Sequence, residues 1–266
     1  MNRIDQTFAR LKRSRRKALI GYLTAGFPTK AGFAHLVCAL EKAGLDLFEI
    51  GVPFSDPVGD GMTIQRSSQK ALANGVTLEW VLRAVSALRP QIKAPIILMS
   101  YANPLAAMGL QRFFARAKAA GVDGVIIPDL IPEEGKPFDQ LAAKNGIALI
   151  YLAAPTTTRK RLKRIARATR GFLYAVSLTG VTGARKTVAA GVPGFLSQIR
   201  RFTSKPVAVG FGISTPSQVQ SVRKRVDGVI VGSALIDQLE KSVQRAGVFV
   251  ASLQKALNPQ GVRHAS

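Results

Sequence analysis

Eight short runs rich in Val, Ile, Leu, Phe or Tyr recur along the chain, and segments with helical periodicity lie between them. Most of these runs are nearly continuous apolar stretches, as expected of parallel strands covered on both faces. They begin at Ala18, Asp46, Pro95, Gly124, Ile147, Gly171, Pro206 and Gly228. Eight strands alternating with helices, with no linker, predict an α/β fold: a single (β/α)8 TIM barrel over residues 1–266, with an extra N-terminal helix.

Two intervals between successive strands are longer than the rest. The strand starts lie 22 to 29 residues apart, except after the second strand, where the interval is 49, and after the sixth, where it is 35. Oversized connections in a compact domain are usually lids or binding loops. Both would open at the carboxyl ends of the strands, where barrel active sites are built. We therefore expect residues 51–65 and 178–194 to form active-site loops.

A weak repeat marks the opposite end of the predicted barrel. The segments AGLDLFEI, AGVDGVII and RVDGVIV each end a helix, turn through an aspartate and enter a strand. Asp46, Asp123 and Asp227 would then lie at the amino ends of their strands, where barrel residues serve stability. We expect no catalytic role for these three side chains.

Glu49 is a carboxylate inside an apolar strand, with Phe48 and Ile50 as its neighbours. Alternation along the strand places Glu49 on the opposite face from both, toward the barrel interior. Burial there is costly unless the group is neutralised, paired or used in chemistry, and it should raise the pKa of Glu49. A structural ion pair with a Lys or Arg is the alternative, but no strand segment offers a basic partner. We therefore favour Glu49 as a group that takes and gives a proton.

The loop after this strand carries a second candidate carboxylate. Asp60 follows Glu49 by eleven residues, far enough for the loop to fold back over the barrel mouth. Two carboxylates in different environments can divide acid–base work. Asp56 and Asp60 could equally form turns or cap a helix, since Asp commonly does both. The spacing favours Asp60 over Asp56.

Three glycine-rich segments follow the last three predicted strands: TGVTGA from Thr179, GFGIS from Gly210 and VGSAL from Val231. Loops at these places in such barrels commonly bind phosphate through backbone N–H groups at a helix N-terminus. Glycine lets the backbone approach an anion, and Ser214 or Ser233 could add a hydroxyl donor. The three segments together predict a phosphate site.

The composition excludes several classes of site. Cys38 is the single cysteine, so no internal disulfide can form, and the two histidines are too few for a His-rich metal site. The basic N-terminus lacks the apolar stretch and cleavage site of a signal peptide. No apolar run approaches the roughly 20 residues that span a bilayer. We expect a cytoplasmic protein without a bound metal.

The charge is strongly basic, with 38 Lys and Arg against 15 Asp and Glu and a net charge of +23. Residues 140–226 hold sixteen of the basic residues and no acidic one. Such a field could attract nucleic acid or an anionic membrane. The densest run, TTTRKRLKRIARATRG, has apolar residues at helical spacing and no interleaved aromatics for base stacking. We therefore favour a solvated basic surface over a nucleic-acid site.

Six segments are characteristic of one enzyme family. They are YLTAGFP from Tyr22, FEIGVPFSDPVGDGMTIQ from Phe48, SYANP from Ser100, PDLIPEE from Pro128, SLTGVTGAR from Ser177 and PVAVGFGIS from Pro206. In these segments, and over essentially its whole length, the chain resembles the α subunit of tryptophan synthase. The resemblance implies a (β/α)8 barrel that cleaves indole-3-glycerol phosphate, by a retro-aldol reaction, to indole and glyceraldehyde 3-phosphate. This is a late step of L-tryptophan biosynthesis.

The resemblance also implies roles for individual residues. Glu49 would transfer protons, and Asp60 would stabilise charge on the indole through its ring N–H. The residues expected near the substrate are Tyr22, Tyr101, Tyr174, Thr182 and Phe211. The phosphate-binding positions are Gly183, Gly212, Gly232 and Ser233.

Partners follow from the same resemblance. A β subunit that carries pyridoxal phosphate would receive the indole in an α2β2 heterotetramer, and this chain itself would hold no cofactor. Pro53 and Asp56 would belong to the interface with that subunit. Two departures from the family lie beside Asp60: Met62 stands where a proline is usual, and Gly59 replaces a common alanine. Both should loosen the loop.

Other functions remain open at this point. One is a stand-alone lyase that releases free indole. Another is a different phosphate-binding barrel, such as an isomerase of a small sugar phosphate. A third, of another class, is a protein that binds nucleic acid or an anionic surface through its positive charge.

Overall fold

A closed parallel sheet forms the centre of the molecule. The computed structural model describes residues 2–57, 59–176 and 191–259. Within these ranges nine strands pair in parallel, in the order β5-β4-β3-β2-β1-β9-β8-β7-β6. The strands are β1 (Ala18–Thr24), β2 (Leu47–Gly51), β3 (Ile96–Met99), β4 (Gly124–Ile126), β5 (Ala148–Ile150), β6 (Leu152–Ala153), β7 (Leu173–Val176), β8 (Val207–Gly210) and β9 (Gly228–Val231).

The barrel closes at a break in the predicted fifth strand. The two ends of the strand order, β5 and β6, are adjacent in the chain and separated by Tyr151 alone. The Tyr151 N–H donates to Thr169 Oγ1 at 3.1 Å, and its carbonyl accepts from the Tyr174 N–H at 3.2 Å. One expected strand is thus divided into two short ones, and the (β/α)8 barrel prediction is confirmed.

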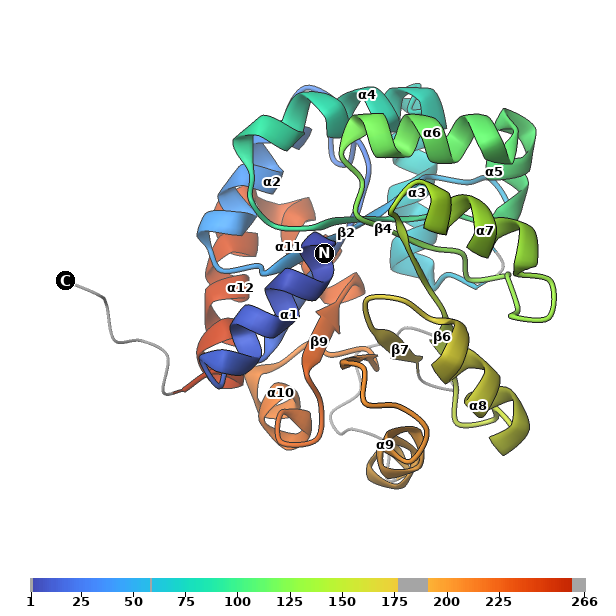
Figure 1. Cartoon of the computed structure of the whole chain (residues 1–266). Coiled ribbons are helices and arrows are strands. Elements are labelled where there is room, and N and C mark those ends of the chain that lie inside the picture. Colours follow the sequence, from blue (N-terminus) through green and yellow to red (C-terminus); the bar gives the residue numbers. More distant parts are fainter. Residues whose placement is uncertain (1, 58, 177–190, 260–266) are drawn as a thin grey trace.

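Helices surround the barrel and cover one of its ends (Figure 1). They are α1 (Arg3–Arg13), α2 (Phe33–Lys42), α3 (Met62–Ala73), α4 (Leu78–Leu88), α5 (Ala102–Met108), α6 (Leu110–Ala120), α7 (Lys136–Lys144), α8 (Arg159–Ala168), α9 (Val192–Arg200), α10 (Pro216–Val222), α11 (Ser233–Lys241) and α12 (Val243–Leu257), with a 3-10 turn, η1, at Arg89–Gln91. Helix α1 precedes the first strand and lies across the strand ends, which confirms the extra N-terminal helix.

Side-chain alternation along the strands creates two apolar cores. Leu47 belongs to the core inside the barrel, which α1 completes with Ile4 and Phe8. Phe48 and Ile50 belong to the larger core between the strands and the outer helices. Because neighbouring residues of a strand face opposite sides, Glu49 points inward, as the sequence predicts.

The three repeated aspartates join neighbouring strands at the amino ends of the barrel. Each carboxylate accepts the backbone N–H of a residue that begins the adjacent strand: Asp46 from Leu19, Asp123 from Ile96 and Asp227 from Val207. Each also lies within ion-pair distance of at least one basic side chain. This arrangement agrees with the structural role expected from the repeat.

Candidate active site

A cavity of about 450 Å³ opens at the carboxyl ends of the strands. It brings together seven of the residues expected in the site, from both halves of the sequence. They are Tyr22, Glu49, Asp60, Tyr174, Gly212, Gly232 and Ser233. Strands β1, β2 and β7 position the first tyrosine, the glutamate and the second tyrosine. Parallel strands direct their carboxyl ends to one face, so residues distant in sequence converge there.

Glu49 is the most deeply buried acid of the cavity, with only 1 % of its surface exposed. It pairs in register with Tyr22 on β1 and Ile97 on β3. Its Oε2 atom is buried and has no hydrogen-bond partner among the described residues. Burial, followed by the nearby Asp60 charge, raises the pKa of Glu49 to about 8. The carboxyl group is therefore mostly protonated at neutral pH.

No basic side chain neutralises Glu49 in the described ranges of the chain. The ion pairs found there all involve other acids. Among the residues that the structure describes, the alternative of a structural ion pair with a Lys or Arg is therefore not observed. An uncompensated polar atom in an apolar barrel costs stability, which is expected where a group serves chemistry.

Asp60 lies in the connection between β2 and α3. Its N–H donates to the Pro57 carbonyl at 3.0 Å, and its carbonyl accepts from Gln65 Nε2 at 2.8 Å. Burial raises the pKa of Asp60 to about 6, although a hydrogen bond from the Tyr101 side chain opposes the shift. Asp60 is therefore mostly ionised at pH 7, whereas Glu49 is mostly protonated. Two carboxyl groups of one cavity thus hold different protonation states.

Tyr101 supports the Asp60 loop and does not form the cavity wall. Its hydroxyl accepts the Gly59 N–H at 2.9 Å, and its ring lies 5.3 Å from that of Phe54. A methyl group added at Gly59 would lie 3.2 Å from the same hydroxyl. The glycine that departs from the family pattern therefore leaves room for the tyrosine to approach the loop.

Two other tyrosines form the walls of the cavity, and glycines make room for them. A Cβ atom at Gly51 would overlap the Tyr22 hydroxyl, and one at Gly210 would lie 2.7 Å from the Tyr174 hydroxyl. The glycine at position 210, which the sequence suggested as part of a phosphate loop, therefore also lets an aromatic ring pack against its strand. Burial is the main reason that the pKa of both tyrosines is raised, so both hydroxyls stay neutral.

The end of the cavity near α11 has the features of an anion site. Gly232 precedes this helix, and Ser233 and Ala234 begin it, so the first free N–H groups lie at the cavity. Gly212 has a φ of +68°, and a Cβ atom there would meet no other atom within 4 Å. Backbone strain, and not crowding, thus favours glycine at 212.

Ser214 lines the same cavity, but its donors are already used. Its backbone N–H and its hydroxyl both bond to Gln218 Oε1, at 2.8 and 3.2 Å. The same oxygen accepts the Thr215 N–H and completes the capping box of α10. Of the two serines considered from the sequence, Ser233 is the better placed to meet an anion.

Comparison with known proteins identifies the relatives of this fold and site. The family model described as tryptophan synthase alpha chain matches residues 8–263. The chain is 53% identical over 242 residues to the tryptophan synthase alpha chain of Chloroflexus aggregans, with 91% of each chain covered. It is 48% identical to that of Roseiflexus castenholzii, covering 96% of this chain and all of the other.

Solved structures of tryptophan synthase chains agree with this family match. A Mycobacterium tuberculosis tryptophan synthase chain superposes with a TM-score of 0.91 at 36% identity, covering 96% of this chain and 98% of the other. The alpha subunit from Legionella pneumophila gives 0.88 at 38% identity, covering 97% and 99%. The chain belongs to the tryptophan synthase alpha chain family. It is an enzyme, a lyase of tryptophan biosynthesis. Because its relatives are named alpha chains, a complex with a beta subunit is implied.

Other residues that the resemblance suggested lie outside the cavity lining of this alpha chain. Phe211 is partly buried and packs against the outer core. Pro53 is buried, and Asp56 is exposed and accepts a hydrogen bond from the Ser55 hydroxyl at 2.5 Å. Thr182 and Gly183 lie outside the described residues, as does most of the expected loop 178–194.

The cavity contains residues that the motifs did not single out. Apolar side chains from four strands line it: Met99, Leu152, Val176 and Ile230. Their inward-facing places at the strand ends are the signal that could have found them. Thr63 and Asp237 add polar groups, and the hydroxyl of Thr63 donates to Asp237 Oδ1 at 3.3 Å. No pattern in the sequence joins these two residues, which lie on α3 and α11.

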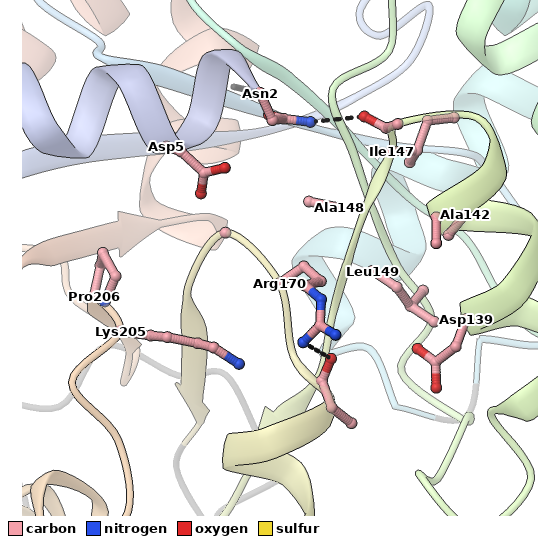
Figure 2. Close-up of a pocket in the computed structure, with 14 residues that line it drawn as sticks. Asn2, Asp5, Asp139, Ala142, Ile147, Ala148, Leu149, Arg170, Lys205 and Pro206 are labelled. Carbon is pink, nitrogen blue, oxygen red and sulfur yellow. Dashed lines mark hydrogen bonds between the residues drawn. The ribbon is translucent and has the colours of Figure 1, made fainter.

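A second cavity, of about 460 Å³, lies at the opposite end of the barrel, where Asp5, Arg170 and Lys205 converge from separate elements (Figure 2). The Lys205 ammonium donates to the carbonyls of Ala166, Arg167 and Thr169 at 2.5–3.1 Å. Arg170 bonds to carbonyls of the same turn. Both cations therefore donate hydrogen bonds to backbone carbonyls at the C-terminal end of α8. We assign no chemistry to this cavity.

The described residues contain neither a metal-binding cluster nor a membrane-spanning helix. No group of three or more His, Cys, Asp or Glu side chains in these ranges could hold a metal ion. Among the helices within them, none is both long and apolar enough to cross a membrane.

Proposed function

We propose that this chain cleaves indole-3-glycerol phosphate to indole and glyceraldehyde 3-phosphate, with Glu49 as the proton-transferring residue and Asp60 as the residue that stabilises charge on the indole. The observation that carries the assignment is the pair of unlike carboxyl groups. Glu49 has a pKa of about 8 and Asp60 a pKa of about 6, and both line one cavity. The reaction needs a proton donor and a carboxylate at the same time.

The reaction cycle begins with Glu49 protonated and Asp60 ionised. Glu49 transfers its proton to C3 of the indole, while the Asp60 carboxylate accepts the ring N–H and stabilises the positive charge on the ring. The Glu49 carboxylate then removes the proton of the hydroxyl group on the side-chain carbon next to C3. The bond from C3 to that carbon breaks, its electrons return to the ring, and the aldehyde forms. Glu49 is protonated again when indole leaves.

Substrate recognition divides between an apolar and an anionic region. The apolar strand ends, with Tyr22 and Tyr174, suit the flat indole ring. Gly212, Gly232 and Ser233 would hold the phosphate at the N-terminus of α11. Thr182 and Gly183 complete the proposal by family resemblance alone. Fixing both ends of the substrate places its C3 carbon beside Glu49, and such orientation lowers the barrier of the reaction.

Indole release by wild type, Glu49→Gln and Asp60→Asn tests this assignment. We expect Glu49→Gln to lower kcat by about 10²–10⁴-fold, because the proton donor is lost. Asp60→Asn should lower it by about 10²-fold. Asp5→Asn, at an exposed acid of α1, is the control and should leave kcat unchanged. Near-normal turnover of the Glu49 variant, or no indole from the wild type, would refute the proposal.

The partner is the part of the proposal that depends most on the family. We place a pyridoxal-phosphate-bearing β subunit over the mouth of the barrel, in an α2β2 assembly in the cytoplasm. Pro53 and Asp56 would meet that subunit, and residues 51–65 and 178–194 would be the active-site loops of one domain, 1–266. Turnover with and without the β subunit separates this reading from a stand-alone lyase, because high activity of the isolated chain would favour the latter.

A further inference from the structure

Helix α8 has one apolar face and one purely cationic face. Leu162, Ile165 and Ala166 are buried against the barrel. The remaining long side chains of the helix are all basic and all exposed: Arg159, Lys160, Arg161, Lys163, Arg164 and Arg167. The helix lies on the outside of the barrel (Figure 1). Because its apolar residues are buried and its basic residues are exposed, the cationic face points to solvent.

This distribution of charge opposes the stability of the helix. Cations three and four residues apart on one helix repel each other, as Lys160, Arg164 and Arg167 do here. The first turn carries Arg159 and Arg161 and no acid, although a helix N-terminus favours negative charge. Folding alone therefore gives no reason for such a surface.

Only part of this charge is neutralised within the chain. Glu133 forms ion pairs with Arg161 and Arg164, at 3.5 and 3.0 Å. Among the described residues the other four basic side chains of the helix have no ion-pair partner. A shallow groove of about 540 Å³ runs beside them, lined by Lys160, Lys163, Arg164, Arg167 and Ala168.

The chemistry of the groove limits what could occupy it. Its lining has four cations and one alanine, and only Arg164 among these cations is paired with a carboxylate, so an extended anion fits it. The exposed face of α8 has no aromatic residue for stacking on unpaired bases. It also has no exposed apolar residue to enter a bilayer. A regular row of phosphates, as in the backbone of a nucleic-acid duplex, meets these conditions.

We propose that the cationic face of α8 binds the phosphate backbone of duplex nucleic acid without sequence preference, at a surface separate from the active site. The sequence favoured a solvated surface because the densest basic run has apolar residues at helical spacing and no interleaved aromatics for base stacking. The structure adds that four of the six cations on this helix have no ion-pair partner among the described residues, and that three of these four line a groove. The binding involves no step of the lyase reaction and does not depend on that assignment.

Fluorescence anisotropy with labelled 20-base-pair duplexes of RNA and of DNA, at 50 to 300 mM KCl, tests the proposal on the full chain. We expect binding at 150 mM KCl that weakens steeply with salt. Lys160→Gln/Lys163→Gln should weaken it about tenfold and reduce the salt slope by about 2, because two phosphate contacts are lost. Arg112→Gln/Lys118→Gln removes the same charge from exposed sites of α6 and should bind nearly as the wild type.

Each other outcome would overturn the proposal. Equal losses in the two double variants would mean attraction to the total charge and no site on α8. Absence of duplex binding at 150 mM KCl would exclude the site. Binding only to phosphatidylserine vesicles, lost in the α8 variant, would assign the surface to membranes. The melting temperature of the α8 variant serves as a folding control, and we expect no decrease because like-charge repulsion is relieved.

Discussion

Glu49 shows how far one residue can be interpreted from its neighbours in sequence. An acid between Phe48 and Ile50, on the inward face of a strand, must be neutral, paired or reactive. The structure buries it, leaves its Oε2 atom without a hydrogen bond, and raises its pKa to about 8. The environment of Asp60 could not be anticipated in the same way, because it depends on burial at the mouth of the closed barrel and on a hydrogen bond from Tyr101, which follows a different strand.

The raised pKa of Glu49 predicts how stability depends on pH. Below its ordinary pKa of 4.5 the group is protonated in both folded and unfolded chains, so it makes no pH-dependent contribution to stability. Between 4.5 and about 8 the unfolded chain loses the proton first, so Glu49 progressively destabilises the fold. We therefore expect Glu49→Gln to gain stability relative to wild type between pH 5 and pH 9, by on the order of 4 kcal/mol. Urea unfolding at both pH values measures this, and an equal difference at both would contradict it.

Tyr101 should set the acidic side of the pH profile. Its hydrogen bond lowers the pKa of Asp60, so Tyr101→Phe should raise that pKa above about 6. Since the proposed mechanism needs Asp60 ionised, the acidic limb of kcat should move to higher pH by roughly one unit. Tyr151→Phe is the matched control, because its hydroxyl donates to Asp139 and lies outside the cavity lining. A purely structural role for Tyr101 would lower activity at every pH alike.

At the scale of elements, the start of α3 determines how firmly the Asp60 loop is held. Gly61 is the N-cap and makes no side-chain bond, and Met62 is the first helical residue and 69% exposed. Neither residue fixes the backbone as a proline would. The loop is instead held by the bonds of Gly59 to Tyr101 and of Gln65 to the Asp60 carbonyl.

Proline at the first position of α3 should order this loop. Proline suits the first turn because no helical bond needs its N–H, and Gly61 already has the extended conformation that precedes proline. We expect Met62→Pro to stabilise the chain by about 0.4–1 kcal/mol and to slow hydrogen exchange of residues 59–66. Met62→Ala separates loss of the side chain from the effect of proline. Unchanged exchange and unchanged indole release in the proline variant would disprove the idea.

At the scale of the whole molecule, the two ends of the barrel do different work. The carboxyl ends hold an uncompensated acid and the free N-terminus of α11. At the amino ends, aspartates and basic side chains bind backbone groups and each other. Chemistry and stability are thus separated along the barrel axis, as is usual in this fold.

Removing a charge from the amino end should therefore affect stability alone. Asp123 is 4% exposed, accepts the Ile96 N–H, and pairs with Arg3 and Arg89 at 2.9 and 3.4 Å. Asp123→Asn leaves both cations without their counter-ion and should cost about 3 kcal/mol in urea unfolding. The kcat/KM of the folded fraction should stay the same. The Asp5→Asn control should also leave kcat/KM unchanged and should cost at most about 1 kcal/mol, because Asp5 lies in the first turn of α1. A loss of kcat/KM with intact stability would show that the two ends are coupled.

Local pattern was enough to predict the barrel, its extra helix, and the acid on its inner face. A continuous apolar run indicates a buried strand, and the alternation of side chains along a strand indicates which way each one points. Both are properties of neighbouring residues. The repeat around Asp46, Asp123 and Asp227 was likewise local, and its structural interpretation agrees with the fold.

Only the tertiary structure decided which distant residues meet. The apolar lining at Met99 and Ile230, the bond from Tyr101 to the Asp60 loop, and the use of Ser214 by Gln218 depend on closure of the sheet. So does the break at Tyr151, on either side of which β5 pairs with β4 and β6 pairs with β7. Sequence by itself determined the strands and the buried acid, because burial is encoded locally. The cavity that gives this acid its pKa arises only when the sheet has closed.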